Sequence, residues 1–219
     1  MVRTVIFDLD GTLLDTLEDL ADSANFALAQ GGFPARTLEE IRGFVGNGVG
    51  LLIHRALPAG TPPEREAACL AAFKAHYLEN MRNKTAPYPG VLDLLDRLNT
   101  NGCKVAVVSN KFDGAVKELC ARYFGDRLPV ALGERPGLDK KPAPDLVRAC
   151  LEALDSSAEE AVYVGDSEVD ILTARNAGLP CYSVTWGFRS REFLREHGAE
   201  RLVDTPEELV DLLLGQTPG

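Results

Sequence analysis

The sequence is short of positive charge and has no long apolar run. Its 219 residues include 23 Lys and Arg against 33 Asp and Glu, a formal net charge of −10. This sign argues against nucleic acid as a partner, because phosphate backbones are bound by basic surfaces. No apolar stretch is long enough to span a bilayer, and no signal-peptide pattern precedes the first apolar run. These absences predict a cytoplasmic protein with no membrane partner.

Paired cysteines and clustered histidines are also missing. The five cysteines are scattered without a Cys-x-x-Cys pair, and the three histidines have no metal-ligand spacing. We therefore expect reduced cysteines that pack in the interior, and histidines with structural or surface roles, rather than disulfides or a zinc site.

What the sequence does have is a set of short apolar runs separated by helical patterns. Four runs are apolar at consecutive positions, as in strands buried on both faces of a parallel sheet: Thr4–Phe7, Lys104–Val108, Ala161–Val164 and Cys181–Val184. Shorter runs suggest further strands at Pro129–Leu132 and Arg201–Val203. Helical patterns follow in alternation: Asp113–Phe124, Ala143–Leu154, Glu168–Ala177 and Pro206–Leu214. The alternation predicts an α/β core with a doubly wound, Rossmann-like parallel sheet.

A helical segment interrupts this alternation after the first strand. It has no strand pattern, and its expected helices are Leu17–Gln30, Leu38–Phe44, Gly50–Leu57 and Pro63–Asn83. The sequence therefore predicts an all-helical domain of residues 15–85, inserted into a catalytic core of residues 1–14 and 86–219.

Polar residues follow several of the predicted strands. They are Asp8 and Asp10, Ser109-Asn110-Lys111, and Gly165-Asp166-Ser167 with Asp170. Lys141 precedes Pro142, which we expect to open a helix. Ligands of open α/β sheets bind beyond the carboxyl ends of the strands, so these groups should meet at one edge.

Each polar group has a simpler interpretation when it is taken alone. Asp8 and Asp10 could begin a calcium loop, but its sixth and twelfth positions hold Leu13 and Asp19 instead of Gly and Glu. Ser109 or Asp166 could cap a helix, and Lys141 could be solvated. Their arrival together at successive strand ends favours an active site.

The motifs, in their order, resemble those of haloacid dehalogenase superfamily phosphatases over nearly the whole chain. The matching segments are Asp8-Leu9-Asp10-Gly11-Thr12, Ser109-Asn110, Lys141-Pro142, and Gly165-Asp166-Ser167 with Asp170. The inserted helices stand where that family has its cap domain. Within the family, the segments 44–48 and 108–111 resemble the phosphoglycolate phosphatases most.

The resemblance implies a magnesium-dependent phosphatase that forms an aspartyl-phosphate, with 2-phosphoglycolate as the expected small phosphorylated substrate. It implies Asp8 as nucleophile, Asp10 as general acid and base, and Lys141 as the group that neutralises charge. The implied metal ligands are Asp8, the backbone carbonyl of Asp10, and Asp166, with Asp170 nearby. Substrate binding is assigned by the same resemblance to Thr12, Ser109 and the amide of Asn110. A carboxylate, with an ordinary pKa near 3.9, can attack phosphorus without a base; the spacing does not say which Asp attacks.

The inserted helices are expected to choose the substrate. Asn47, in the glycine-rich segment 46–50, and Arg55 are candidates to bind a substrate carboxylate. The segment could equally be an ordinary turn between helices, and Arg55 could be solvated.

Other functions stay open at this point. A phosphatase or phosphomutase of the same fold could act on pyrophosphate, a sugar phosphate or a nucleotide. A receiver-type signalling domain also joins acidic residues, a hydroxyl and a lysine, but it would not need the helical insert. A dehalogenase is disfavoured, since attack on carbon needs neither a metal nor Asp10. The sequence is compatible with a monomer or a homodimer.

Overall fold

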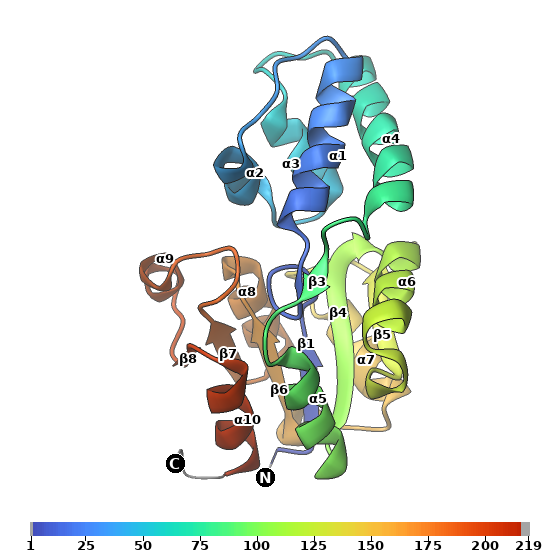
Figure 1. Cartoon of the computed structure of the whole chain (residues 1–219). Coiled ribbons are helices and arrows are strands. Elements are labelled where there is room, and N and C mark those ends of the chain that lie inside the picture. The colour runs from blue at the N-terminus through green and yellow to red at the C-terminus, as the bar shows by residue number, and fades with distance from the viewer. Residues whose placement is uncertain (1, 216–219) are drawn as a thin grey trace. The chain divides into compact units, whose positions relative to one another are not determined.

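The computed structural model describes residues 2–215, which divide into two compact units (Figure 1). The residues up to Leu14 and from Pro87 onward form one unit, here called the core unit. Asp15–Ala86 form the other, here called the helical unit. The chain thus returns to the core unit one residue later than the expected boundary after residue 85.

The core unit is built on a six-stranded parallel sheet. Its strands lie in the order β5 (Val130–Glu134), β4 (Lys104–Phe112), β1 (Thr4–Phe7), β6 (Ala161–Gly165), β7 (Cys181–Val184) and β8 (Leu202–Val203). From the central β1 the chain first builds β4 and β5 on one side, and then crosses to β6, β7 and β8 on the other. The predicted doubly wound α/β fold is confirmed. The order reverses beside β1, so a ligand site is expected where β1 ends between β4 and β6.

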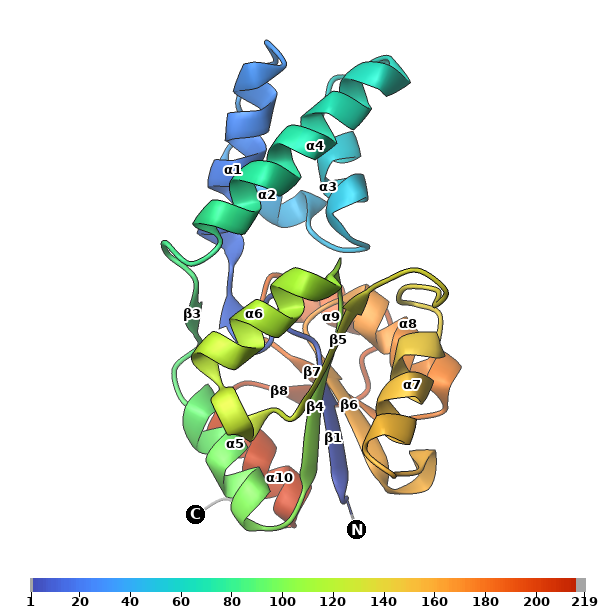
Figure 2. The ribbon, with the colours of Figure 1, turned by 90° about the vertical axis from the view of Figure 1, so that its right-hand side faces the viewer.

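Helices cover both faces of the sheet (Figure 2). One face is covered by α7 (Asp145–Ala153) and α8 (Glu168–Ala177), and the other by α5 (Val91–Thr100), α6 (Asp113–Tyr123) and α10 (Pro206–Leu214). The face under α7 and α8 is closed by a buried apolar cluster that includes Ile6, Val108, Leu146, Val147, Tyr163 and Ala174. Short 3-10 turns lie at Gly125–Arg127 and Ala158–Glu160.

Two helices of the core unit were not predicted from the sequence. In α5 the buried residues Val91, Leu94, Leu95 and Leu98 have the spacing of an amphipathic helix, so the signal was present. In α9 (Arg191–Glu196) the signal is weaker, because the helix has only six residues. Its start is marked by Ser190, whose hydroxyl accepts a hydrogen bond from the Phe193 N–H.

Two predicted boundaries near the strand ends are wrong. Ser109-Asn110-Lys111 lies within β4 and not beyond it, because the strand runs to Phe112. The pairing of β4 with β5 shifts register between Val108 and Phe112, as at a β-bulge, a device that re-aims side chains beside active sites. Pro142 does not open a helix, since α7 begins at Asp145.

The helical unit contains α1 (Leu17–Gln30), α2 (Leu38–Phe44), α3 (Val49–Ala56) and α4 (Pro63–Asn80). Two of these match the expected bounds, while α3 lies one residue earlier and α4 ends three residues earlier. Its interior holds Leu20, Leu28, Ile53, Phe73 and Tyr77, all buried. The two connections to the core unit form short paired strands, β2 (Leu14–Asp15) and β3 (Ala86–Pro87).

The cysteines and histidines have the structural roles expected for them. All five cysteines are free thiols, and four are buried. His54 contacts Glu66, His76 contacts Ser23, and His197 contacts the Phe193 carbonyl. In residues 2–215, no helix combines the length and apolar character that crossing a membrane requires.

Candidate active site

The first part of the site is the turn that follows β1. Asp8 is buried at the end of the strand, and its Oδ1 accepts a hydrogen bond of 2.7 Å from the Leu9 N–H. Gly11 has φ +84°, and a Cβ atom there would lie 2.3 Å from Asp166 Oδ2. Only glycine therefore allows this tight turn to pass so close to Asp166.

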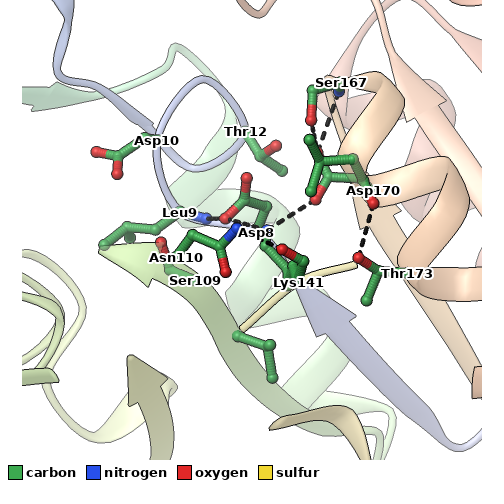
Figure 3. Close-up of polar contacts among 12 residues, drawn as sticks. Asp8, Leu9, Asp10, Thr12, Ser109, Asn110, Lys141, Ser167, Asp170 and Thr173 are labelled. Atoms are coloured by element: carbon green, nitrogen blue, oxygen red, sulfur yellow. Dashed lines mark hydrogen bonds and ion pairs between the residues drawn. The ribbon is translucent and has the colours of Figure 1, made fainter. Parts of the chain in front are cut away.

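Lys141 links the turn to α8 through a buried network (Figure 3). Its Nζ lies 2.8 Å from Asp8 Oδ1, 2.8 Å from Asp170 Oδ1 and 3.1 Å from the Tyr163 hydroxyl. The other Asp170 oxygen accepts hydrogen bonds from the Ser167 N–H and hydroxyl, at 3.1 and 2.6 Å. Both oxygens of Asp170 therefore accept hydrogen bonds. Ser167 orients the Asp170 carboxylate, and this carboxylate orients the Lys141 ammonium.

Asp166 is held by a segment whose role the sequence did not predict. Its Oδ1 accepts a hydrogen bond of 3.1 Å from the Thr12 hydroxyl, and its Oδ2 accepts one of 2.7 Å from the Phe188 N–H. The Trp186 indole N–H donates to the Thr12 carbonyl at 2.9 Å. Gly187 lies between Trp186 and Phe188 in the sequence, and a Cβ atom there would lie 2.3 Å from Asp166 Cβ. The run Trp186-Gly187-Phe188 after β7 carries no motif signal apart from a glycine between aromatics.

The remaining candidate residues of the core unit are Asp10 and the motif Ser109-Asn110-Lys111 of β4. The Asp10 carboxylate points away from Asp8 (Figure 3), and its Oδ1 lies 3.0 Å from Lys111 Nζ. The sequence placed Lys111 in the motif but gave it no role. Asn110 Nδ2 donates to the Lys141 carbonyl at 2.9 Å, so the second motif also positions the third. The Ser109 hydroxyl oxygen accepts a hydrogen bond of 3.2 Å from the Lys111 N–H.

The site has more negative than positive charge. Oxygen atoms of Asp8, Asp166 and Asp170 lie within 4.8 Å of one another. Burial and the neighbouring Asp170 raise the pKa of Asp8 to about 7, although Lys141 opposes the shift. Burial, Asp170 and Asp8 raise the pKa of Asp166 well above its usual range. Burial alone would lower the pKa of Lys141, but the Asp170 and Asp8 carboxylates outweigh it and raise that pKa.

The two candidate residues of the helical unit belong to the segment that runs from the end of α2 through α3. Asn47 has φ +61° and lies in the connection between α2 and α3, with Gly46 and Gly48 also at positive φ. Arg55 Nη1 donates to the Phe44 carbonyl at 3.0 Å, so its guanidinium is attached to the end of α2. The structure brings the predicted core residues together. It places Asn47 in the connection between α2 and α3, and Arg55 in α3 with a hydrogen bond to the last residue of α2.

Known proteins share both the sequence and the fold of this chain. A model of the family "Haloacid dehalogenase-like hydrolase" matches residues 5–184. A phosphoglycolate phosphatase of Cereibacter sphaeroides is 38% identical over 216 residues, covering 95% of this chain and 96% of its own length. A crystal structure from Lactobacillus delbrueckii subsp. bulgaricus, of a protein provisionally named phosphoglycolate phosphatase, has 38% identity and a TM-score of 0.93. It covers 98% of this chain and 99% of its own.

A further similar structure holds a ligand. CbbY from Rhodobacter sphaeroides, solved in complex with phosphate, is 30% identical with a TM-score of 0.76. The similarity covers 95% of this chain and 96% of that one.

Proposed function

The chain belongs to the haloacid dehalogenase-like hydrolase family, and we propose that it hydrolyses 2-phosphoglycolate to glycolate and inorganic phosphate with the help of magnesium. One observation carries the chemistry: the buried contact of 2.8 Å between Asp8 and Lys141, at the sheet edge where ligands bind. The substrate is supported by the Cereibacter sphaeroides relative, a phosphoglycolate phosphatase 38% identical to this chain.

The reaction has two displacements at phosphorus. In the first, an Asp8 oxygen bonds to phosphorus while the ester P–O bond breaks, and Asp10 gives its proton to the departing glycolate oxygen. In the second, water attacks the aspartyl-phosphate, Asp10 takes the water's proton, and the Asp8–phosphorus bond breaks to release phosphate. Such proton transfer typically contributes about 10²–10⁴-fold to a rate.

The other residues of the site bind the phosphoryl group or position the side chains around it. We assign the Ser109 hydroxyl and the Asn110 backbone amide to the phosphoryl oxygens, because the Asn110 side chain is bonded to the Lys141 carbonyl. Lys141 neutralises the charge that gathers between the phosphoryl group and Asp8. Thr12 is fully buried and donates to Asp166, so we assign it to positioning that carboxylate and not to contacting substrate.

The donor set of the site fits magnesium. Three buried carboxylates lie close together, and the Lys141 ammonium contacts two of them, Asp8 and Asp170, so the pocket has fewer cations than carboxylates. Burial and the neighbouring carboxylates accordingly raise the pKa of Asp8 and Asp166. Carboxylate and carbonyl oxygens are the hard ligands that Mg²⁺ prefers. Asp8, Asp166 and the Asp10 carbonyl would hold the ion, while Asp170 remains bonded to Lys141 and Ser167. When bound, the ion supplies positive charge that keeps both carboxylates ionised beside an anionic phosphate.

The helical unit is assigned the part of a cap that selects the substrate. The connection between α2 and α3 supplies backbone amides at Gly46, Asn47 and Gly48, all at positive φ. Arg55, bonded to the Phe44 carbonyl, stabilises this connection and brings positive charge to it. Closure of a cap would exclude bulk water from the site while Asp8 attacks the substrate.

A screen of phosphate esters with magnesium tests the proposal. Released phosphate would be measured for 2-phosphoglycolate, pyrophosphate, hexose phosphates and nucleotides, with Asp8→Asn as the inactive control. We expect 2-phosphoglycolate to have the highest kcat/KM. A preference of about a hundredfold for a hexose phosphate, or about 2.7 kcal/mol, would contradict the substrate assignment but not the phosphatase chemistry.

A further inference from the structure

A second buried lysine lies next to the proposed active site. Among the described residues, Lys111 and Lys141 are the only buried lysines or arginines, with 3% and 2% of their surface exposed. Each contacts one aspartate of the first motif: Lys141 Nζ lies 2.8 Å from Asp8, and Lys111 Nζ lies 3.0 Å from Asp10. The nucleophile and the proton donor therefore each have a buried ammonium beside them.

The position of Lys111 is fixed by the strand that carries it. Its backbone N–H donates to the hydroxyl oxygen of Ser109, the residue assigned to the phosphoryl group. From β5, Gly133 packs so closely that a Cβ there would lie 2.6 Å from the Lys111 carbonyl oxygen. These contacts fix the backbone of Lys111 at the bulge of β4.

The contact with Asp10 places Lys111 on the side of the leaving group. A general acid must come within hydrogen-bond distance of the oxygen it protonates, here the ester oxygen of the leaving group. In 2-phosphoglycolate one CH₂ group separates that oxygen from the carboxylate. The substrate carboxylate is therefore one CH₂ group from the oxygen that Asp10 would protonate, and the Lys111 ammonium lies 3.0 Å from the Asp10 carboxylate.

The charge of the site favours the same assignment. The substrate's carboxylate would enter a pocket that already holds several carboxylates, in a chain of net charge −10. Its binding requires a compensating cation, because an unpaired buried charge is strongly unfavourable. Lys141 is engaged on the Asp8 side by Asp8 and Asp170. Lys111 is the buried cation on the leaving-group side.

We propose that Lys111 binds the carboxylate of the leaving group and selects phosphate esters that carry a carboxylate on the ester carbon. This inference rests on the proposed phosphatase function and adds the residue that recognises the substrate. Lys111 makes an ion pair with that carboxylate while Asp10 serves the ester oxygen.

The first test compares two substrates of nearly equal size, 2-phosphoglycolate and 2-hydroxyethyl phosphate, which lacks the carboxylate. Lys111→Met should lower kcat/KM for 2-phosphoglycolate about 10- to 100-fold more than for 2-hydroxyethyl phosphate, as expected when a buried charge pair is lost. Lys111→Arg, which keeps the charge, should retain part of the preference. Lys104→Met, at the exposed start of the same strand, is the matched control and should leave the ratio unchanged.

The second test measures binding without turnover, so that it does not depend on proton transfer by Asp10. The ligands are 3-phosphonopropionate and 3-hydroxypropylphosphonate, in which CH₂ replaces the ester oxygen of the two substrates. By calorimetry with magnesium, Lys111→Met should weaken 3-phosphonopropionate at least about tenfold and change 3-hydroxypropylphosphonate less than about twofold. Should Lys111→Met not fold, Lys111→Gln provides the same comparison.

The outcomes separate this inference from the proposed function. Equal losses on both members of each pair would overturn the inference and show that Lys111 acts only through Asp10. The inference also fails if the wild type hydrolyses both substrates equally well, although the phosphatase chemistry then stands. Release of phosphate from none of the screened esters would instead refute the proposed function.

Discussion

The core unit and the helical unit hold their candidate residues in different ways. In the core unit, Asp8, Asp166 and Lys141 are almost completely buried, and each contacts groups from other strands or loops. In the helical unit, Asn47 and Arg55 are half-buried, and the hydrogen bond that Arg55 makes to Phe44 is local to one connection. The buried partners of the core unit constrain the side chains of Asp8, Asp166 and Lys141, whereas the side chains of Asn47 and Arg55 have fewer such constraints.

This difference agrees with the proposed division between chemistry in the core unit and substrate selection in the helical unit. Attack on phosphorus needs a nucleophile, a cation and a proton donor in fixed geometry, which a network of buried partners can supply. Choice among small substrates needs a surface that can vary without disturbing that network. The position of Lys111 would qualify this division, because it places one selective group inside the core unit.

The largest expected effect is that of Asp8→Asn. Without the carboxylate no phosphoenzyme can form, so kcat should fall about 10⁴-fold or more with every substrate. Asn47→Ala is the matched change in the helical unit, and p-nitrophenyl phosphate is a substrate that makes little demand on selection. With that substrate we expect Asn47→Ala to lose less than about tenfold. Comparable losses in the two variants would break the division between the units.

Asp10→Asn should have a smaller effect that depends on the leaving group. Proton transfer is lost, which costs about 10²–10⁴-fold with alkyl phosphates. Nitrophenolate leaves without protonation, so formation of the aspartyl-phosphate from p-nitrophenyl phosphate should survive better than its hydrolysis. Rapid mixing should then show a burst of about one equivalent of nitrophenol, followed by slow release. Asp8→Asn should show no burst, and wild-type turnover of alkyl phosphates by Asp10→Asn would refute the acid–base assignment.

Much of the core unit could be predicted because its signals are local. Four strands are consecutive apolar runs, and the polar residues at their ends meet because parallel strands share one carboxyl edge. The boundary errors have local causes as well. The strand β4 continues through polar residues at its bulge, and α7 starts three residues after Pro142.

The contacts that position the site could not be predicted in the same way. Trp186 contacts Thr12 and Phe188 contacts Asp166, although more than 20 residues of sequence separate the partners in each pair. Nothing in the sequence of the segment 186–188 indicates these contacts. The pairing of Lys111 with Asp10 depends on side-chain directions at the bulge. Asp19, expected only as a helical residue, is buried and accepts hydrogen bonds from two backbone N–H groups and a hydroxyl.

Asp19 provides a test of the helical unit by stability instead of chemistry. Its carboxylate joins the start of α1 to the Lys84 and Thr85 N–H groups and the Thr85 hydroxyl. Asp19→Ala removes both acceptor oxygens, and leaving these buried donors unpaired should lower the free energy of unfolding by about 2–3 kcal/mol. Asp22→Ala is the matched control, because Asp22 is exposed and its ion pair with Lys84 lies at the surface, where such pairs contribute little to stability. Equal midpoints in urea for both variants would show that the Asp19 contacts do not stabilise the fold.

The smallest effect concerns the charge of the core site as the pH changes. The pKa of Asp8 is raised from 3.8 to about 7, by burial first and then by Asp170. Between these two values the folded protein binds a proton that the unfolded chain releases. Stability linked to Asp8 is therefore fully present below about pH 4 and is lost as the pH rises toward 7. Asp166, whose pKa is also raised, shifts stability in the same direction.

Thermal unfolding at pH 5.5 and 7.5 measures this linkage. In EDTA, the wild type should lose about 1–2 kcal/mol between the two pH values, which lowers Tm by a few degrees in a chain of this size. Magnesium should raise Tm more at pH 7.5 than at pH 5.5, because the ion binds the ionised carboxylates. Asp8→Asn removes one of the titrating groups and should flatten the pH dependence in EDTA. A magnesium effect of equal size at both pH values would show that the ion does not bind at these aspartates.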